Sequence, residues 1–257
     1  MQNINYTNDN GIITIGLRRP KVNALNRELL GELSEACDRI RQDDTARVVI
    51  LRSELDNFCA GADLKERQGM SESDVKKFVR YVIGGTIHKI GDLELPTIAA
   101  VNGSALGGGC ELALACDFRI FSEDVKTGLR ETALGIIPGA GGTQRLPRLI
   151  GYQKALHWIL TARVFTAQEA LHDGVAMEVC TLNELHARAQ ALAEEILANA
   201  PIAVRQAKKA VRLGMGTSLQ NALEIENECY NDVIPTEDRL EALKAFSEKR
   251  KPNWSNR

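Results

Sequence analysis

Two glutamates lie twenty residues apart in the chain, and each is next to a glycine-rich stretch. Glu111 ends the segment 106–111, which contains three consecutive glycines, and Glu131 opens the segment 131–139, which contains two more. Glycine lets a backbone approach a ligand closely, and a glycine run that leads into a helix presents unpaired N–H groups. Such amides can hold an enolate oxygen, while paired carboxyl groups can move protons. If the glutamates meet in one cleft, these residues predict proton transfer beside a carbonyl, such as that of an acyl thioester.

Each candidate residue also has a purely structural interpretation. Glu131 could be an exposed loop carboxylate paired with Arg130, whereas Glu111 opens an apolar helix, where a charge is costly unless it is used or paired. Cys110 could be a nucleophile, but no histidine is near it in the sequence, and free cysteine is commonly a small core residue. The six cysteines form no CxxC pair and the four histidines are scattered, so we expect neither a disulfide framework nor a metal site.

The composition is that of an ordinary globular protein. The 257 residues are 44% hydrophobic and 26% charged, with a net charge of −2. A net charge this close to zero provides no electrostatic field that would attract nucleic acid or an acidic membrane. The segment 1–10 has neither the apolar core of a signal peptide nor the arginines of a transit peptide, and no apolar run approaches the ~20 residues that span a bilayer. We therefore expect a cytoplasmic protein without a membrane partner.

The segments around the glutamates predict alternating strands and helices. β-Branched and apolar runs bounded by glycine, proline or charged residues predict the strands. The run at 47–52 is almost continuously apolar, as a parallel strand buried on both faces must be. The predicted strands are 12–17, 47–52, the first part of 96–103, and 118–121.

Helical spacing of apolar residues predicts the elements between these strands. Asn26 is a suitable N-cap for a helix at 27–42. The segment 110–116 follows the triple glycine directly and is apolar nearly all round, so we expect it to be deeply buried. Strand, turn, helix and strand at this spacing indicate right-handed crossovers in an α/β core. A short helix after the turn at 58–64 and a longer one at 71–93 complete this part of the chain.

The composition changes beyond Gly142. From Arg145 to the last residue the sequence predicts only helices, separated by short breaks. We divide the chain near residue 200, into a core over 1–200 that contains the candidate site and a helical region over 201–257. A terminal piece of three helices has little core of its own, so we expect it to pack on another subunit.

Three blocks of sequence, taken together, resemble the enoyl-CoA hydratase (crotonase) superfamily. These blocks are Phe58–Glu66, Pro96–Glu111 and Gly135–Leu146. Their order and separation make the resemblance specific, and it extends over essentially the whole chain. Two further stretches, Gly128–Thr132 and Ile234–Leu240, are most similar to the methylglutaconyl-CoA hydratase branch.

The resemblance implies an α/β fold in which repeated ββα units form a spiral. A C-terminal helical region would close this spiral and pack homotrimers, and trimers often pair into hexamers. The resemblance also implies an oxyanion hole made by two backbone amides, which by motif position are those of Ala62 and Gly108. Gly108 would lie at the start of a buried helix, where its N–H is unpaired and the helix dipole favours a negative oxygen. Such a donor typically contributes ~3 kcal/mol to transition-state binding.

By the same resemblance, Glu111 and Glu131 occupy the acid/base positions of a hydratase, which adds water across the α,β double bond of a 2-enoyl-CoA thioester. Glu111 would deprotonate the water that attacks the β-carbon, and Glu131 would deliver a proton to the α-carbon. The two carboxyl groups can also titrate as a coupled pair, which blurs this division. No cofactor is implied, because coenzyme A is part of the substrate.

Eight further residues match positions that hold coenzyme A in the family. Ala24 and Leu25 lie in a loop similar to the one that lines the adenine and pantetheine groove. Phe246 and Lys249 would reach the adenine and the 3′-phosphate of a ligand on a neighbouring subunit, although Lys249 could equally be a solvated C-terminal charge. The residues expected to follow the pantetheine arm are Ala60, Asp63, Leu64 and Lys65, together with Ala62.

Two other functions are compatible with this fold, another acyl-CoA reaction and RNA binding. An enoyl-CoA isomerase would normally keep only one acid/base carboxylate, so the presence of both glutamates favours a hydratase over an isomerase or another acyl-CoA lyase of this superfamily. An RNA-binding protein on this fold would need a basic stripe. The helix at 27–42 is instead rich in acidic residues, and the more basic segment 201–213 has the pattern of a solvated face. We therefore expect no nucleic-acid partner.

The sequence leaves the acyl group open. The walls of its pocket are expected from about 66–85 and from 136–142. Arg130 and Lys65 are candidate partners for an acidic acyl tail.

Overall fold

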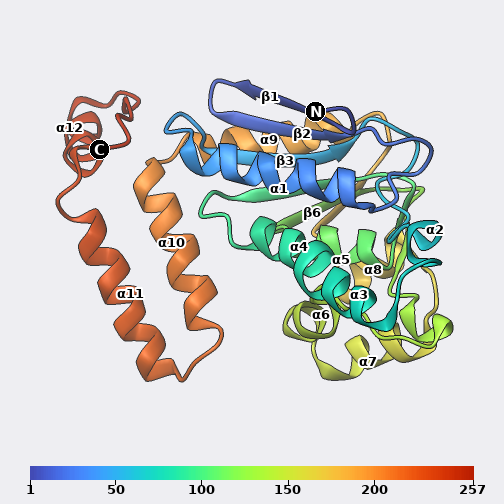
Figure 1. Ribbon diagram of the computed structural model, residues 1–257. Coiled ribbons are helices and arrows are strands. Elements are labelled where there is room, and N and C mark those ends of the chain that lie inside the picture. The colour runs from blue at the N-terminus through green and yellow to red at the C-terminus, as the bar shows by residue number, and fades with distance from the viewer.

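The central sheet has six strands in the order β1-β2-β3-β4-β6-β9, and a computed structural model describes it together with the rest of residues 1–257 (Figure 1). β1 pairs with β2 in an antiparallel hairpin, and every later pair is parallel. Parallel neighbours need long crossover connections, which the helices provide. The strands are β1 (Ile4–Asp9), β2 (Ile12–Leu17), β3 (Val48–Ser53), β4 (Thr97–Val101), β6 (Phe118–Ser122) and β9 (Glu178–Cys180).

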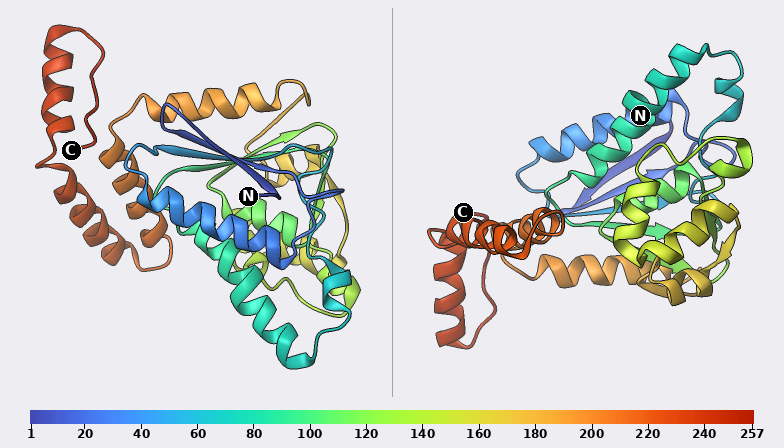
Figure 2. Two further views of the ribbon diagram at one scale, coloured as in Figure 1. Left: turned by 45° about the horizontal axis from the view of Figure 1, so that its top comes forward. Right: turned by 90° about the horizontal axis from the view of Figure 1, so that it is seen from below.

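Both faces of the sheet are covered by helices, and alternate residues of each strand serve the two faces. On β3, Val49 and Leu51 belong to a large core shared with α1 (Arg27–Gln42), α4 (Gly84–Gly91) and α5 (Gly108–Ala115). The other apolar residues of β3, Val48 and Ile50, pack in a smaller cluster with α9 (Leu185–Leu197). Figure 2 shows this layering, with the orange α9 on one side of the strands and α1 on the other. The almost continuous apolar sequence of β3 follows from this double burial.

A second, three-stranded sheet lies next to the start of α5. Its members are β5 (Ser104–Leu106), β7 (Lys126–Gly128) and β8 (Phe165–Thr166). β5 and β7 are parallel, and the amide of Gly107 donates to the carbonyl of Gly128 at 2.8 Å. This sheet therefore fixes the backbone that enters the triple glycine.

The predicted helices are present, with one change of detail. Asn26 caps α1, accepting a hydrogen bond from the amide of Leu29 at 3.0 Å, and the helix has the predicted bounds. The helix expected at 71–93 is interrupted by a wider π-helical turn at Phe78–Ile83, between α3 (Glu72–Lys77) and α4. A short α2 (Leu64–Arg67) precedes it, and α6 (Gly142–Ile150), α7 (Tyr152–Thr161) and α8 (Ala167–Asp173) follow β7.

The expectation of helices alone after Arg145 is wrong. β8 and β9 lie in that part of the chain, and β9 extends the central sheet by pairing with β6. With two and three residues, these strands are too short to show a period in the sequence. β1 was also missed, because only Ile4 of its six residues is buried and its sequence is largely polar.

The last part of the chain consists of α10 (Pro201–Gly214), α11 (Leu219–Val233) and α12 (Glu237–Glu248). α10 and α11 lie side by side, at a distance from most of the core (Figure 1). α10 is tied to the core by Lys208, which donates to Asp117 at 2.6 Å and to the carbonyl of Leu95 at 2.9 Å. None of the helices combines the length and apolar character needed to cross a membrane. The division of the chain near residue 200 stays a prediction.

Asn23 joins the loop after β2 to the loop after β3. Its side chain is fully buried, and its Nδ2 donates to Ser53 Oγ at 2.8 Å and to the carbonyls of Asn57 and Phe58 at 3.1 Å. Its own carbonyl accepts from Cys59 Sγ at 3.1 Å. With φ at 51°, it also has a left-handed backbone that asparagine tolerates better than most residues. Asn23 therefore sets the path of the chain into residues 58–62.

Replacing Asn23 by Ala should lower the free energy of unfolding by about 2–3 kcal/mol, because buried acceptors lose their donor. Denaturant unfolding at one fixed protein concentration measures this loss. Asn10→Ala is the matched control, since Asn10 has the same φ of 51° but lies on the surface. Equal effects of the two substitutions would show that the backbone conformation, and not the buried hydrogen bonds, is responsible.

Candidate active site

A cavity of about 1100 Å³ lies between the start of α5 and the helical segment 72–91, and both Glu111 and Glu131 line it. Its volume suits a ligand of cofactor size. The walls are formed by residues from 60–64, 75–88, 106–111 and 130–140, and by Arg67. The two glutamates therefore share one cleft, which was the condition for the proton chemistry considered from the sequence.

Two backbone amides lie close together at this cavity, those of Ala62 and Gly108. Leu25 and Ala62 form a parallel bridge. In this bridge the amide of Leu25 donates to the Gly61 carbonyl at 2.8 Å and the amide of Asp63 donates to the Leu25 carbonyl at 3.0 Å, so the amide of Ala62 has no partner. Gly108 is the first residue of α5 and has no helical partner for its N–H. A Cβ added to Gly108 would be 3.6 Å from the Ala62 nitrogen, which shows how close the two amides are. The pair can therefore donate to one shared oxygen.

Two glycines of the triplet, Gly107 and Gly109, are needed because other parts of the chain pack closely against them. A Cβ at Gly109 would lie 2.0 Å from the carbonyl oxygen of Cys59, and one at Gly107 would lie 2.7 Å from Glu131 Oε1. Gly107 also has φ at 52° and ψ at −121°, a conformation that side chains disfavour. The loop 58–62 can lie against α5 only because position 109 is glycine, and Glu131 can lie against the start of α5 only because position 107 is glycine.

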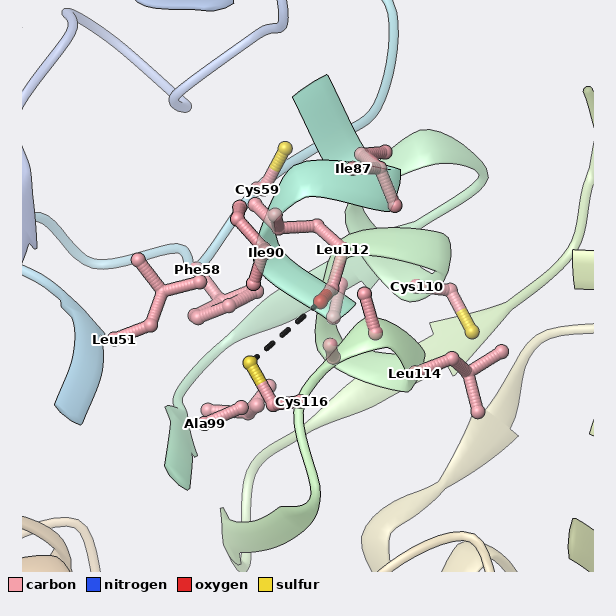
Figure 3. Close-up of a cluster of buried hydrophobic side chains, with 14 of the residues drawn as sticks. Leu51, Phe58, Cys59, Ile87, Ile90, Ala99, Cys110, Leu112, Leu114 and Cys116 are labelled. Carbon is pink, nitrogen blue, oxygen red and sulfur yellow. Dashed lines mark hydrogen bonds between the residues drawn. The ribbon is translucent and has the colours of Figure 1, made fainter. Parts of the chain in front are cut away.

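α5 is buried along its whole length. All eight of its residues are inaccessible or nearly so, and Leu112 lies in a cluster with Phe58 and Ile90 (Figure 3). Figure 3 also shows Cys116 Sγ, which makes a weak contact with the Leu112 carbonyl at 3.8 Å. A helix packed on every side cannot shift easily, so its first turn is a rigid support for the amide of Gly108.

Glu111 is held by one backbone amide just before α6 and by the first amide of α6. Its Oε1 accepts from the amides of Ala140 and Gly142 at 2.7 and 2.8 Å, and the residue is only 3% exposed. Burial raises the pKa of Glu111 to about 7, against the lowering effect of the two amides, and the negative charge of Glu131 raises it further. Oε2 makes no hydrogen bond to the protein, so it is free to exchange a proton with a ligand.

Glu131 begins a 3₁₀ turn, Glu131–Leu134, and packs against Gly107. Burial raises its pKa as well, while its own amide and the charge of Arg67 oppose the shift. Its Oε2 is buried without any hydrogen-bond partner. Glu131 and Arg130 form no ion pair, and Arg130 is exposed, so the structural interpretation of Glu131 as a surface carboxylate does not hold.

The surroundings of Cys110 disfavour a nucleophilic role. Its side chain is 1% exposed, and burial raises the pKa of its thiol to about 12. A thiol with such a pKa is almost never ionised near neutral pH, whereas the thiolate is the reactive form. Its small side chain instead fills part of the core.

This geometry can be compared with known proteins. The model of the family described as enoyl-CoA hydratase/isomerase matches residues 7–257. The chain belongs to this family. Its relatives include probable enoyl-CoA hydratase 2, mitochondrial, of Arabidopsis thaliana, which is 48% identical over 96% of this chain and 82% of the relative. Methylglutaconyl-CoA hydratase, mitochondrial, of Homo sapiens is also 48% identical, over 95% of this chain and 74% of the relative.

Solved structures of the family confirm the predicted architecture. The crystal structure of an enoyl-CoA hydratase from Bacillus anthracis aligns with a TM-score of 0.97 at 47% identity, over 100% of both chains. The α/β crotonase fold with a helical C-terminal region, expected from the sequence blocks, is therefore correct.

Only some of the residues expected to hold coenzyme A reach the cavity of this family member. Ala60 and Leu64 line it, together with Ala62. Leu25 has no exposed surface, Ala24 is half-buried, and neither lines the cavity. For both, the predicted coenzyme contact stays a prediction.

The remaining predicted contacts lie outside the cavity. Asp63 pairs with Arg19 at 2.7 Å and its carboxylate caps α2, so this side chain has a structural role. Lys65 is exposed and is not among the lining residues. Phe246, which is 86% exposed, and Lys249 belong to α12 and its C-cap, at the opposite end of the molecule from α2 and α3 (Figure 1). A single chain therefore cannot bring them to its own cavity.

Two features of the site were missed in the sequence. The first is the pair of amides that bind Glu111, those of Ala140 and Gly142. Apart from the glycine, the residue types at these positions give no sign that their backbone binds a carboxylate. Arg67 lines the cavity and interacts electrostatically with both glutamates. Its position within the expected pocket wall at 66–85 was the only available signal.

One glutamate carboxyl group should titrate near pH 7. In protein labelled with ¹³C at the glutamate side chains, the NMR resonance with this pKa should disappear in Glu111→Gln. In Glu131→Gln the same resonance should titrate at lower pH, because loss of the neighbouring negative charge removes one cause of the raised pKa. A resonance at its ordinary pKa in the wild type would show that Glu111 is not desolvated.

Proposed function

We propose that this chain is an enoyl-CoA hydratase, which adds water across the α,β double bond of a 2-enoyl-CoA thioester. The observation that carries the proposal is the meeting of two carboxyl groups of raised pKa with two unpaired amides at one cavity. The names of its relatives, enoyl-CoA hydratase and methylglutaconyl-CoA hydratase, support this reaction.

The amides of Ala62 and Gly108 would bind the thioester oxygen. As water attacks, the electron pair of the double bond moves towards the thioester, and its oxygen acquires the charge of an enolate. Fixed N–H donors stabilise that charge more than they stabilise the neutral carbonyl, which lowers the barrier. The dipole of α5 acts in the same direction, because Gly108 is at its N-terminus.

The two glutamates would move the protons. Oε2 of Glu111 takes a proton from water as the water oxygen bonds to the β-carbon, and a protonated Glu131 gives its proton to the α-carbon as the enolate collapses. The product is a 3-hydroxyacyl-CoA, and the resting protonation returns by exchange with solvent. A carboxyl group with a pKa near neutrality can both accept and release a proton at little cost. No cofactor takes part, since coenzyme A belongs to the substrate.

The binding of coenzyme A would begin at Ala60 and Leu64, where the pantetheine arm enters the cavity. We place Phe246 and Lys249 against the coenzyme of a neighbouring subunit in a trimer or hexamer. The apolar side chains of α12 support such an assembly, because Leu240 and Leu243 are each 59% exposed in the single chain. Sedimentation of the purified protein as a monomer would contradict it.

Purified wild type should hydrate crotonyl-CoA, seen as loss of absorbance at the enoyl-thioester band. Glu111→Gln and Glu131→Gln should each lower kcat by roughly 10²–10⁴-fold, the usual contribution of a general acid or base. Glu123→Gln is a matched control, since this glutamate is exposed and its side chain makes no hydrogen bond. Full activity of Glu131→Gln would remove that residue from the mechanism. Conversion of a 3-enoyl-CoA without any hydration would indicate an isomerase instead.

The pH profile of kcat/KM for crotonyl-CoA should have an acidic limb near pH 7. Activity should increase as pH rises through this value, because Glu111 must lose its proton to act as the base. A profile that is flat from about pH 5 to pH 9 would contradict this assignment, because a base with a pKa of about 7 loses activity on the acidic side of that range.

A further inference from the structure

Arg67 is a cation at the cavity without a counter-ion. It forms no ion pair and its guanidinium donates no hydrogen bond, and its Nε is buried without a partner. The adjacent carboxylate, that of Glu66, is directed to Arg27, whose amide donates to it at 3.2 Å and whose Nε is 3.9 Å away. A half-buried charge without a partner is costly, so this arrangement favours an anionic ligand beside the guanidinium.

The surroundings of Arg67 keep its side chain beside the reacting groups. It extends from α2 next to the ring of Phe78, with 5.8 Å between the guanidinium and the ring centre. Burial lowers the pKa of Arg67, and the negative charges of Glu111 and Glu131 oppose this shift, so that all three groups share one electrostatic environment. Neither glutamate lies within 4 Å of the guanidinium to form an ion pair. An anion that enters between these groups would therefore find Arg67 available.

The acceptor that best fits this position belongs to the acyl chain and not to the phosphates of coenzyme A. The pantetheine arm separates those phosphates from the thioester, whereas Arg67 lies near the two carboxyl groups that flank the reacting carbons. Two other arginines of the lining, Arg80 and Arg130, are exposed and also lack hydrogen bonds, so solvent screens their charges more than that of Arg67. An acyl chain that is apolar throughout would leave the guanidinium of Arg67 without a counter-ion.

We propose that Arg67 binds a carboxylate at the far end of the acyl group, so that the cavity selects 2-enoyl-CoA thioesters of dicarboxylic acids. This inference rests on the proposed hydration and adds to it the class of acyl group and the residue that recognises it. A planar guanidinium suits this task, because it can donate two parallel hydrogen bonds to one carboxylate. Arg67 thus replaces Lys65 and Arg130, the partners considered from the sequence: Lys65 does not line the cavity, and Arg130 is exposed.

Two substrates that differ only at the chain end test the proposal. In trans-glutaconyl-CoA the chain ends in a carboxylate, and in trans-5-methylhex-2-enoyl-CoA an isopropyl group of similar shape takes its place. Wild type should have the higher kcat/KM for glutaconyl-CoA. Arg67→Met should lower that value by roughly 10- to 100-fold, as expected for lost charge-assisted hydrogen bonds, and change the value for the isopropyl substrate by less than about threefold. Arg67→Lys, which keeps the charge, should retain part of the preference.

Arg80→Met is the matched control, because Arg80 also lines the cavity but is exposed beside Tyr81. It should affect both substrates alike. Equal losses for both substrates in Arg67→Met would overturn the proposal and show that Arg67 acts on the glutamates. A wild type that prefers the isopropyl substrate would also overturn it, with hydration itself intact. Hydration of neither thioester would instead contradict the proposed function, so the two failures are distinguishable.

Discussion

The contact on which the site depends is the approach of the Cys59 carbonyl to Gly109. A Cβ at that position would lie 2.0 Å from the oxygen, so only glycine lets the loop 58–62 lie against α5. This contact sets the spacing of the amides of Ala62 and Gly108. Asn23 holds the same loop from the other side through its bond to the Phe58 carbonyl. Hydrogen bonds and packing far from any ligand thus determine the geometry at which an oxygen would be held.

The second property of the site is that it keeps two acids in a place where charge is unfavourable. Burial raises the pKa of both Glu111 and Glu131, and the charge of Glu131 raises the pKa of Glu111 further. A fold could relieve this cost with a direct ion pair, but Glu111 receives only backbone amides and Glu131 receives no partner for Oε2. The free energy from packing the large core therefore offsets the cost of burying two carboxyl groups with few polar partners. Such a cost is common at reactive sites.

Much of this could be predicted from the sequence, for reasons that differ between elements. α1 was predicted with its bounds, because Asn26 marks its start and six apolar residues follow at helical spacing. The position of α5 followed from the triple glycine and an apolar segment. β1 and β9 could not be found, because a polar edge strand and a three-residue strand acquire their structure from their neighbours. The role of the loop before α6 was also hidden, since backbone amides that bind a carboxylate depend on conformation and not on residue type.

Gly108 and Glu111 belong to one turn of α5, whereas Glu131 belongs to a separate 3₁₀ turn that touches the helix at Gly107. The amide that we propose binds the thioester oxygen and the first carboxyl group therefore move as a unit, and their separation cannot change unless the helix unwinds. The second carboxyl group depends on a different piece of backbone. The site is modular in this sense: the 3₁₀ turn can be rebuilt to place another group, or none, over an unchanged thioester. For the redesign of such an enzyme, this turn is the part that can be exchanged and α5 is the part that must be kept.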